Sequence, residues 1–219
     1  MILETVSLDP AGMLQTLHLQ HSDNSLDRLI RQTTSLALLE SAAQLSSLAA
    51  SEVRLQLNDM HASDIDLMQS QLHGLGENLL SIQQGVQGFS QGFISWVMSD
   101  QSALLLTREL LDEPSRFSEM TEMEQEAFTE ITNISLNSCL AHFTQAFDCR
   151  FFSQLPRFQY QRPGPLWDEL KCTRNSAALW MGQVAISTGR EDYPALLLVS
   201  GIFGDMFPTR ATGHRQVDF

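Results

Sequence analysis

The order of the expected helices and strands repeats once along the chain, and this repeat restricts the fold more than any other feature of the sequence. In both copies, hydrophobic periodicity predicts a long helix, then a strand, a loop and two further strands. The first copy comprises a helix over 26–51, a strand over 52–59, a polar loop over 62–77 and strands over 79–87 and 89–99. The second comprises a helix over 121–147, a strand over 149–156, a Pro-rich loop over 157–170 and strands over 177–187 and 193–203.

Such a duplication predicts one domain of the α/β class. Two copies of one unit can pair about a pseudo-twofold axis, so we expect one mainly antiparallel sheet with the long helices packed on it. A further helix over 100–112 ends the first copy. The predicted domain covers 26–207, with halves at 26–114 and 118–207, between an N-terminal extension at 1–25 and a flexible tail at 208–219.

Composition argues against several classes of function. Hydrophobic residues make up 43% of the chain and charged residues 18%, which predicts a buried core rather than disorder. The formal net charge is −13, from 26 acidic against 13 basic residues, and it argues against binding to nucleic acid or to a membrane surface. The N-terminus lacks the basic segment of a signal peptide, and the apolar runs are too short to cross a bilayer. We therefore expect a cytoplasmic protein.

Residues that commonly bind metals or form disulfides show no such pattern in the sequence. Cys139, Cys149 and Cys172 are odd in number and lack CxxC spacing, so we expect three buried thiols rather than disulfides or a zinc site. His18 and His21 are three positions apart but have no third ligand nearby in the sequence. We expect no metal site of the chain's own.

The segment Met123–Phe143 carries a narrow polar stripe on an otherwise apolar helix. Thr121 and Glu124 form a T-x-x-E capping box that starts this helix. The stripe consists of Glu126, Glu130, Asn133 and Asn137, at steps of four, three and four. Ile131 and Ile134 are expected to be buried on the other side. Periodicity alone permits two interpretations, an ordinary solvated face or a small chemical device.

The sequence EITNISLNS resembles the signature E-I-G-N-I-[GS]-x-G-[NS] of the CheC/CheX/FliY family of chemotaxis response-regulator phosphatases. Their fuller motif is similar to an acid or Ser, three residues, Glu, two residues, Asn, twenty-two residues and Pro. Its positions are matched here by Glu126, Glu130, Asn133 and Pro156. Thr132 and Asn137 stand where the family has Gly, which would allow a partner backbone to approach more closely.

The resemblance implies a CheC-like fold and hydrolysis of the aspartyl phosphate on a CheY-like response regulator. By this resemblance, Glu130 would pair with a lysine of the regulator and Asn133 would hold a water in line with phosphorus, so both are the expected catalytic residues. Glu126, Asn137 and Pro156 are the expected partner-binding residues. The resemblance implies no cofactor of the chain's own, because Mg²⁺ would arrive with the phosphorylated regulator.

The first helix lacks the Glu–Asn pair. A shift of 96 residues between the halves aligns Thr34 and Ala37 with the motif's Glu and Asn, so the first helix is predicted to be an inactive copy. Two alternatives to the enzyme stay open. One is a non-catalytic module that binds response regulators, as the flagellar-switch relatives do. The other is a homodimeric scaffold with no regulator.

Overall fold

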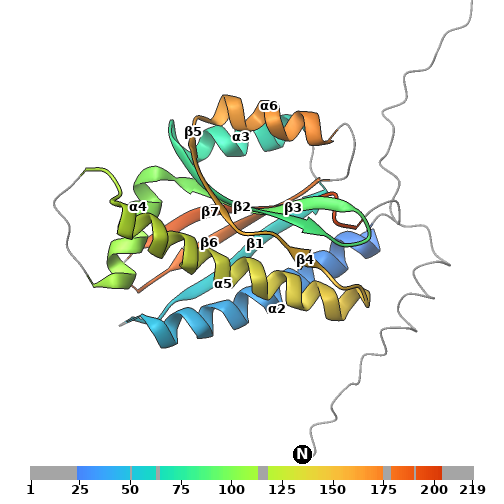
Figure 1. The fold of residues 1–219 in the computed structure, drawn as a ribbon, viewed down its shortest axis with the longest axis horizontal. Helices are drawn as coiled ribbons and strands as arrows, with labels where there is room; N and C mark the ends of the chain where they lie inside the picture. Colours follow the sequence, from blue (N-terminus) through green and yellow to red (C-terminus); the bar gives the residue numbers. More distant parts are fainter. Residues whose placement is uncertain are drawn as a thin grey trace, which may run out of the picture.

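Strands from both halves of the chain join a single antiparallel sheet in the computed structural model (Figure 1). The structure describes residues 24–49, 51–62, 65–112, 118–174, 179–189 and 191–203. Within these residues the sheet has seven strands: β1 (Arg54–Ala62), β2 (Leu79–Gln87), β3 (Gln91–Ser99), β4 (Phe152–Ser153), β5 (Arg157–Gln161), β6 (Leu179–Ser187) and β7 (Asp192–Ser200). Residues 1–23 of the predicted extension and the whole predicted tail lie outside the described residues.

Strands from one half of the chain pair with strands from the other half. The sheet order is β1-β6-β7-β3-β2-β4, so β1 of the first half lies beside β6 of the second. In the same way, β4 and β5 of the second half pair with β2 of the first. The β3–β7 pair joins the two β-hairpins at the centre of the sheet. The predicted duplicated α/β fold with one antiparallel sheet is confirmed.

Helices cover both faces of this sheet (Figure 1). The two long helices, α2 (Asn24–Leu48) and α5 (Glu122–Phe147), lie side by side on one face, as predicted. On the other face lie α3 (Ile65–Leu75) and α6 (Pro163–Arg174). Helix α4 (Asp100–Leu111) follows β3 directly and packs against α5. Among the described residues, we find no helix with both the length and the apolar character needed to cross a bilayer.

Two apolar cores fill the space between the sheet and its helices. The larger core lies under α2 and α5, and its fully buried members include Ile30, Leu38, Trp96, Phe128 and Phe143. The smaller core lies under α3 and α6 and includes Met68, Leu72, Leu166, Trp167 and Leu170. Burial of each large apolar side chain stabilises the fold by about 1.5–3 kcal/mol, so these two cores hold the helices against the sheet.

Four elements differ from the sequence-based prediction. Helix α3 lies in the segment predicted to be a polar loop. Its buried Met68 and Leu72 are one turn apart, and the polar residues around them conceal this narrow apolar face. Helix α6 occupies the predicted Pro-rich loop, because Pro163 stands at its first position, where a missing N–H breaks no helical hydrogen bond. Strand β5 also lies in that loop, whereas the strand predicted over 149–156 shortens to β4.

The two halves are offset by a different number of residues than predicted. The buried positions of the two long helices match at a shift of 98, since Ile30, Leu38 and Leu45 correspond to Phe128, Leu136 and Phe143, and strands β1 and β4 also begin 98 residues apart. The shift of 96 is therefore wrong, and an error of two positions on a helix turns a side chain by ~200°. Thr34 and Ala37, the expected counterparts of the motif's Glu and Asn, are fully buried. The corrected counterparts are Gln32 and Ser35, which are exposed.

Candidate functional site

The polar stripe predicted on α5 lies at the surface of the molecule. Its members Glu126, Glu130 and Asn137 are exposed, and Asn133 is half-buried. Ile131 and Ile134, predicted to be buried, are half-buried instead, because they lie at the borders of the core-facing side of the helix. The centre of that side consists of Phe128, Thr132, Ser135, Cys139 and Phe143.

The side-chain oxygen of Asn133 accepts two hydrogen bonds. One comes from Nε2 of Gln84 in β2 at 2.6 Å, and the other comes from Nδ2 of Asn137 one helical turn later at 3.0 Å. A carbonyl oxygen has two lone pairs, so its usual acceptor positions are both occupied. The Asn133 Nδ2 group has no hydrogen-bond partner within the described part of the chain. Asn133 is therefore arranged as a donor toward an incoming group.

Pro156, the distant member of the motif, directly precedes β5, the strand that pairs with β2. The β2–β5 register pairs Gln83 with Arg157, which places Pro156 at the level of Gln84. The preceding segment follows β2 closely, since the backbone N–H of Gln154 donates to the carbonyl of Gly85 at 2.8 Å. The segment that carries Pro156 therefore follows β2, whose Gln84 contacts Asn133, although 22 residues separate Asn133 from Pro156.

An open groove of about 330 Å³ runs between α2 and α5, beside Asn133. Its lining combines polar and apolar side chains: Glu40, Gln44, Asn133, Ile134, Asn137, Ser138 and Ala141. The two helices are joined beneath it, because the Ser138 hydroxyl donates to the Ala37 carbonyl at 3.0 Å. Farther along α5, Nε2 of His142 lies 3.5 Å from the Glu40 carboxylate. The groove is thus a concave surface that a partner can enter next to Asn133.

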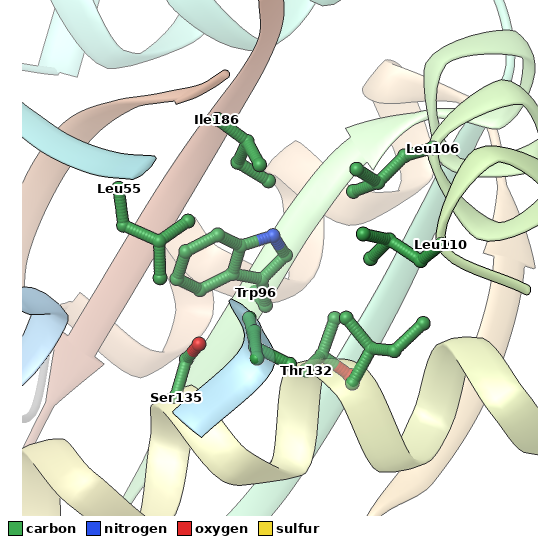
Figure 2. Close-up of a pocket in the computed structure, with 9 residues that line it drawn as sticks. Leu55, Trp96, Leu106, Leu110, Thr132, Ser135 and Ile186 are labelled. Carbon is green, nitrogen blue, oxygen red and sulfur yellow. The ribbon is translucent and has the colours of Figure 1, made fainter. Parts of the chain in front are cut away.

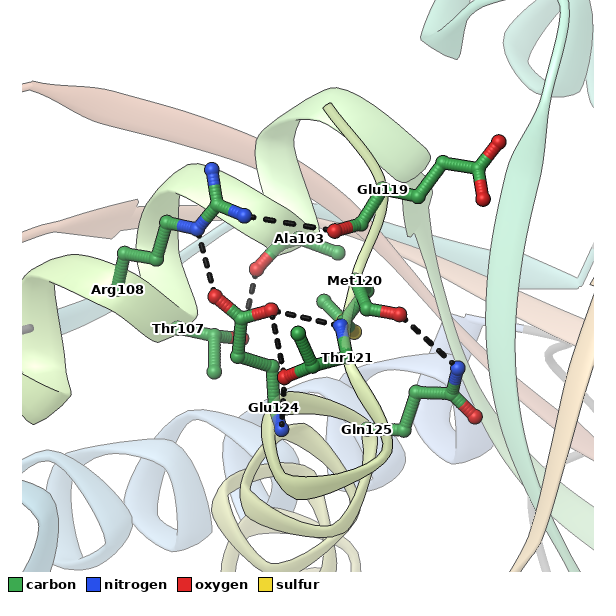
Figure 3. Close-up of polar contacts among 8 residues, drawn as sticks. All are labelled: Ala103, Thr107, Arg108, Glu119, Met120, Thr121, Glu124 and Gln125. Carbon is green, nitrogen blue, oxygen red and sulfur yellow. Dashed lines mark hydrogen bonds and ion pairs between the residues drawn. The ribbon is translucent and has the colours of Figure 1, made fainter. Parts of the chain in front are cut away.

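The start of α5 is fixed by a buried ion pair and the predicted capping box (Figure 3). Nε of Arg108 in α4 lies 2.6 Å from the Glu124 carboxylate. That carboxylate also accepts from the backbone N–H of Thr121 at 2.7 Å and from its hydroxyl at 2.9 Å. The hydrogen bond from Arg108, assisted by those from Thr121, holds the pKa of Glu124 below its usual value. These contacts set where the first turns of α5 begin, and hence where the polar stripe lies.

A small apolar cavity lies beneath the site, between α5 and the sheet (Figure 2). Its volume is about 10 Å³, and Thr132 and Ser135 line it opposite the ring of Trp96. Thr132 is buried, and its hydroxyl donates to the Phe128 carbonyl at 2.9 Å. The expectation that Thr132 affects how closely a partner approaches is therefore wrong, because its side chain faces the core. Of the two departures from the family's Gly positions, only Asn137 lies on the surface.

The cysteines differ in their surroundings. Cys139 is fully buried, and burial raises the pKa of its thiol to about 12. Cys149 is half-buried rather than buried as predicted, and partial burial raises its pKa as well. The side chain of Cys172 lies outside the described residues. In the described part of the chain, no three His, Cys, Asp or Glu side chains are grouped as a metal site.

Gln84 is a site residue that the sequence reasoning missed. In β2, the residues facing α2 and α5 alternate with those facing α3 and α6. Leu80, Ile82 and Val86 form the row under α2 and α5, and Gln84 interrupts it. A polar residue in an apolar row requires a hydrogen-bond partner. That signal is present in the sequence, but it does not say that Asn133, 49 residues later, is the partner.

Comparison with known proteins identifies the fold. No protein-family model matches the chain, and no curated protein matches it in sequence. Among solved structures, Thermotoga maritima FliY has a TM-score of 0.62 at 10% identity, over 83% of this chain and 93% of that one. A chain of the FliG–FliM complex from H. pylori has a TM-score of 0.60 at 14% identity, over 81% and 93%.

A third similar structure is the chemotaxis protein CheX from Desulfovibrio desulfuricans. Its TM-score is 0.50 at 12% identity, over 78% of this chain and 98% of that one. At such identities the shared property is the arrangement of helices and strands, and function has to be argued from the site. The chain has the CheC-like fold, and its structural neighbours are CheC/CheX/FliY-like chemotaxis proteins.

Proposed function

We propose that this chain binds a CheY-like response regulator through the exposed face of α5 and hydrolyses the aspartyl phosphate of that regulator. One observation carries the proposal. Glu130 and Asn133, which match the phosphatase motif, share an accessible helix face in a fold that FliY and CheX also have. Fold alone does not select this function, so the roles below are argued from the side chains.

Glu130 is suited to docking a basic partner. Its side chain is exposed, and it makes no hydrogen bond or ion pair within the described residues. Glu126, one turn earlier, adds a second exposed carboxylate to the same face. An ammonium group of the regulator would therefore be attracted to Glu130 and would compete with no internal partner for it. This gives Glu130 a role in forming and orienting the complex.

Asn133 is suited to the phosphoryl group itself. Its Nδ2 group is a hydrogen-bond donor without an internal partner in the described chain, and phosphoryl oxygens are acceptors. Donation to a phosphoryl oxygen would place the group at the mouth of the α2–α5 groove. Phosphoryl transfer depends mainly on positioning and charge stabilisation, which an amide can supply. The Mg²⁺ ion belongs to the regulator and would neutralise the remaining phosphate charge.

A second candidate function is binding of the regulator without hydrolysis. Both acceptor positions of the Asn133 oxygen are occupied, by Gln84 and by Asn137. To accept a hydrogen bond from the attacking water, that oxygen would have to give up one of these contacts. This arrangement favours a binding module, whereas the exposed Glu130 and the Asn133 donor favour the phosphatase.

The deciding experiment measures loss of phosphate from a panel of acyl-phosphorylated CheY-like regulators, with and without this protein. Binding is measured in parallel by calorimetry, and FliG is included as a probe because FliG and FliM form one of the similar structures. Faster dephosphorylation that Asn133→Ala removes would support the phosphatase. Binding without acceleration would support the second candidate. Absence of both would contradict the proposal, and light scattering would then test the homodimeric scaffold.

A further inference from the structure

Gln84 occupies a buried position where an apolar side chain would be more favourable for stability. It is 2% exposed and lies between Ile82 and Val86 in the row of β2 that faces the larger core. Burial of a primary amide is unfavourable unless its hydrogen bonds are made inside the protein. A glutamine at this position therefore needs a structural or functional reason.

The one hydrogen bond of the Gln84 side chain within the described residues leads to Asn133. Nε2 of Gln84 lies 2.6 Å from Oδ1 of Asn133, whereas Oε1 of Gln84 is buried and has no partner among the described residues. A buried amide with only half of its groups satisfied is a poor choice for stability alone. This hydrogen bond links the sheet to the half-buried residue at the centre of the proposed site.

We propose that Gln84 is a positioning residue that orients the Asn133 amide so that Nδ2 faces the regulator. This inference rests on the proposed function and adds a residue that the motif does not contain. Because Gln84 donates to the oxygen of Asn133, the Asn133 nitrogen, which has no partner among the described residues, is the group left for the regulator. Phosphoryl oxygens only accept, so this orientation is the one that matches a phosphorylated partner. Gln84 acts through Asn133 and does not touch the phosphoryl group.

The test compares three substitutions in β2. Gln84→Met keeps the length of the side chain and removes the donor, and Gln84→Glu keeps the length with a group that donates only when protonated. Gln83→Met is the matched control, since Gln83 is the preceding glutamine and its side chain lies on the opposite face of the strand. Thermal unfolding of each variant establishes that it is folded.

Gln84→Met is expected to weaken binding of the acyl-phosphorylated regulator, or to lower kcat where hydrolysis occurs, by about 10-fold. Binding of the unphosphorylated regulator, which lacks the phosphoryl acceptor, should change less than about twofold. Gln83→Met should match wild type in both assays. Combined with Asn133→Ala, Gln84→Met should add less than about twofold, because its effect passes through Asn133.

Gln84→Glu provides a readout that a merely structural role would not affect. Buried carboxyls tend to be protonated, and a neutral glutamic acid can donate to the Asn133 oxygen as glutamine does. Its activity relative to wild type should therefore rise as the pH is lowered, while the Gln84→Met ratio stays constant. This comparison also serves if Gln84→Met does not fold.

The outcomes separate this inference from the function on which it rests. If wild type neither binds nor dephosphorylates any regulator, the proposed function fails and this inference fails with it. If Asn133→Ala is impaired while folded Gln84→Met behaves as wild type, or if an impaired Gln84→Glu does not recover as the pH is lowered, only the inference is overturned. The inference would also be overturned if Gln84→Met lowered binding or kcat by the same factor in the wild-type and Asn133→Ala backgrounds.

Discussion

The Arg108 guanidinium in α4 lies 2.6 Å from the Glu124 carboxylate in the first turn of α5, and only 14% and 5% of the two side chains are exposed. Removal of one partner from such a pair leaves the other charge buried and unpaired. Arg108→Met is therefore expected to lower the free energy of unfolding by about 3 kcal/mol, measured by urea denaturation at neutral pH. Arg31→Met is a suitable control, because its ion pair with Asp59 is half-exposed and should contribute less than about 1 kcal/mol.

The same pair makes stability depend on acidic pH. The folded pKa of Glu124 is depressed below its usual value of 4.5, so the unfolded chain takes up a proton first as the pH falls. The contribution of Glu124 is therefore fully present above pH 4.5 and is lost as the pH falls through the depressed folded pKa. We expect the free energy of unfolding of Glu124→Gln to depend less on pH than that of wild type, measured between neutral pH and pH 3. An unchanged pH slope in this variant would contradict the assignment.

Substitutions of Asn133 and Glu130 are expected to affect different steps, turnover and complex formation respectively. Asn133→Ala removes a group needed chiefly in the transition state and should lower turnover by at least ~10²-fold, about 2.7 kcal/mol, with little loss of binding to the unphosphorylated regulator. Glu130→Ala removes an interfacial charge and should weaken complex formation by roughly 1–3 kcal/mol. Dephosphorylation at limiting and saturating regulator separates the two effects. Wild-type turnover in Asn133→Ala would place the site elsewhere.

On α2, the corrected offset distinguishes surface positions from core positions. Gln32→Ala and Ser35→Ala replace the exposed counterparts of the motif and should leave turnover unchanged and stability within about 0.5 kcal/mol. Ala37→Leu should instead destabilise by about 1–3 kcal/mol, because Ala37 is fully buried and its carbonyl accepts from Ser138 of α5. Thermal denaturation measures the change in stability of each variant, and the phosphatase assay measures its turnover. Tolerance of Ala37→Leu without loss of stability would restore the 96-residue alignment.

Long, strongly periodic segments explain why much of the fold was predictable. Helix α5 has a capping box at Thr121 and Glu124 and a continuous apolar side, so its bounds follow from local chemistry. Helix α3 was not predictable in this way, because Met68 and Leu72 are its main buried side chains and only the packed sheet makes them a core face. Strand β5 forms because β2 offers it an edge, which is a property of the assembled sheet.

The candidate site likewise has one part that the sequence predicts and another that depends on how distant elements pack together. The spacing of Glu130 and Asn133 on one helix face depends only on helical geometry and was predictable. The contact with Gln84 depends on which face of β2 meets α5, and the orientation of Thr132 depends on the packing around Trp96. Neither relation is encoded within a few residues, so local periodicity could not supply it.

Asn137 offers the last prediction, because it occupies one of the two acceptor positions of the Asn133 oxygen at 3.0 Å. Asn137→Ala removes that donor and leaves the Gln84 contact in place, so the oxygen gains a free position for a water. If hydrolysis requires such a water, turnover should rise by about 3- to 10-fold at unchanged regulator affinity. Because alanine is a better helix former than asparagine, stability should stay equal or increase by up to about 0.7 kcal/mol.

Two companion variants make this prediction specific to the Asn133 oxygen. Asn137→Gly, which places the family's residue at this position, should match the gain in turnover but lose stability by up to about 1 kcal/mol relative to alanine. In combination with Asn133→Ala, Asn137→Ala should bring no gain, because the oxygen that it frees is absent. A gain that persists without Asn133 would show that Asn137 limits the approach of the regulator rather than the access of water. No gain in any background would show that hydrolysis does not require a water on the Asn133 oxygen.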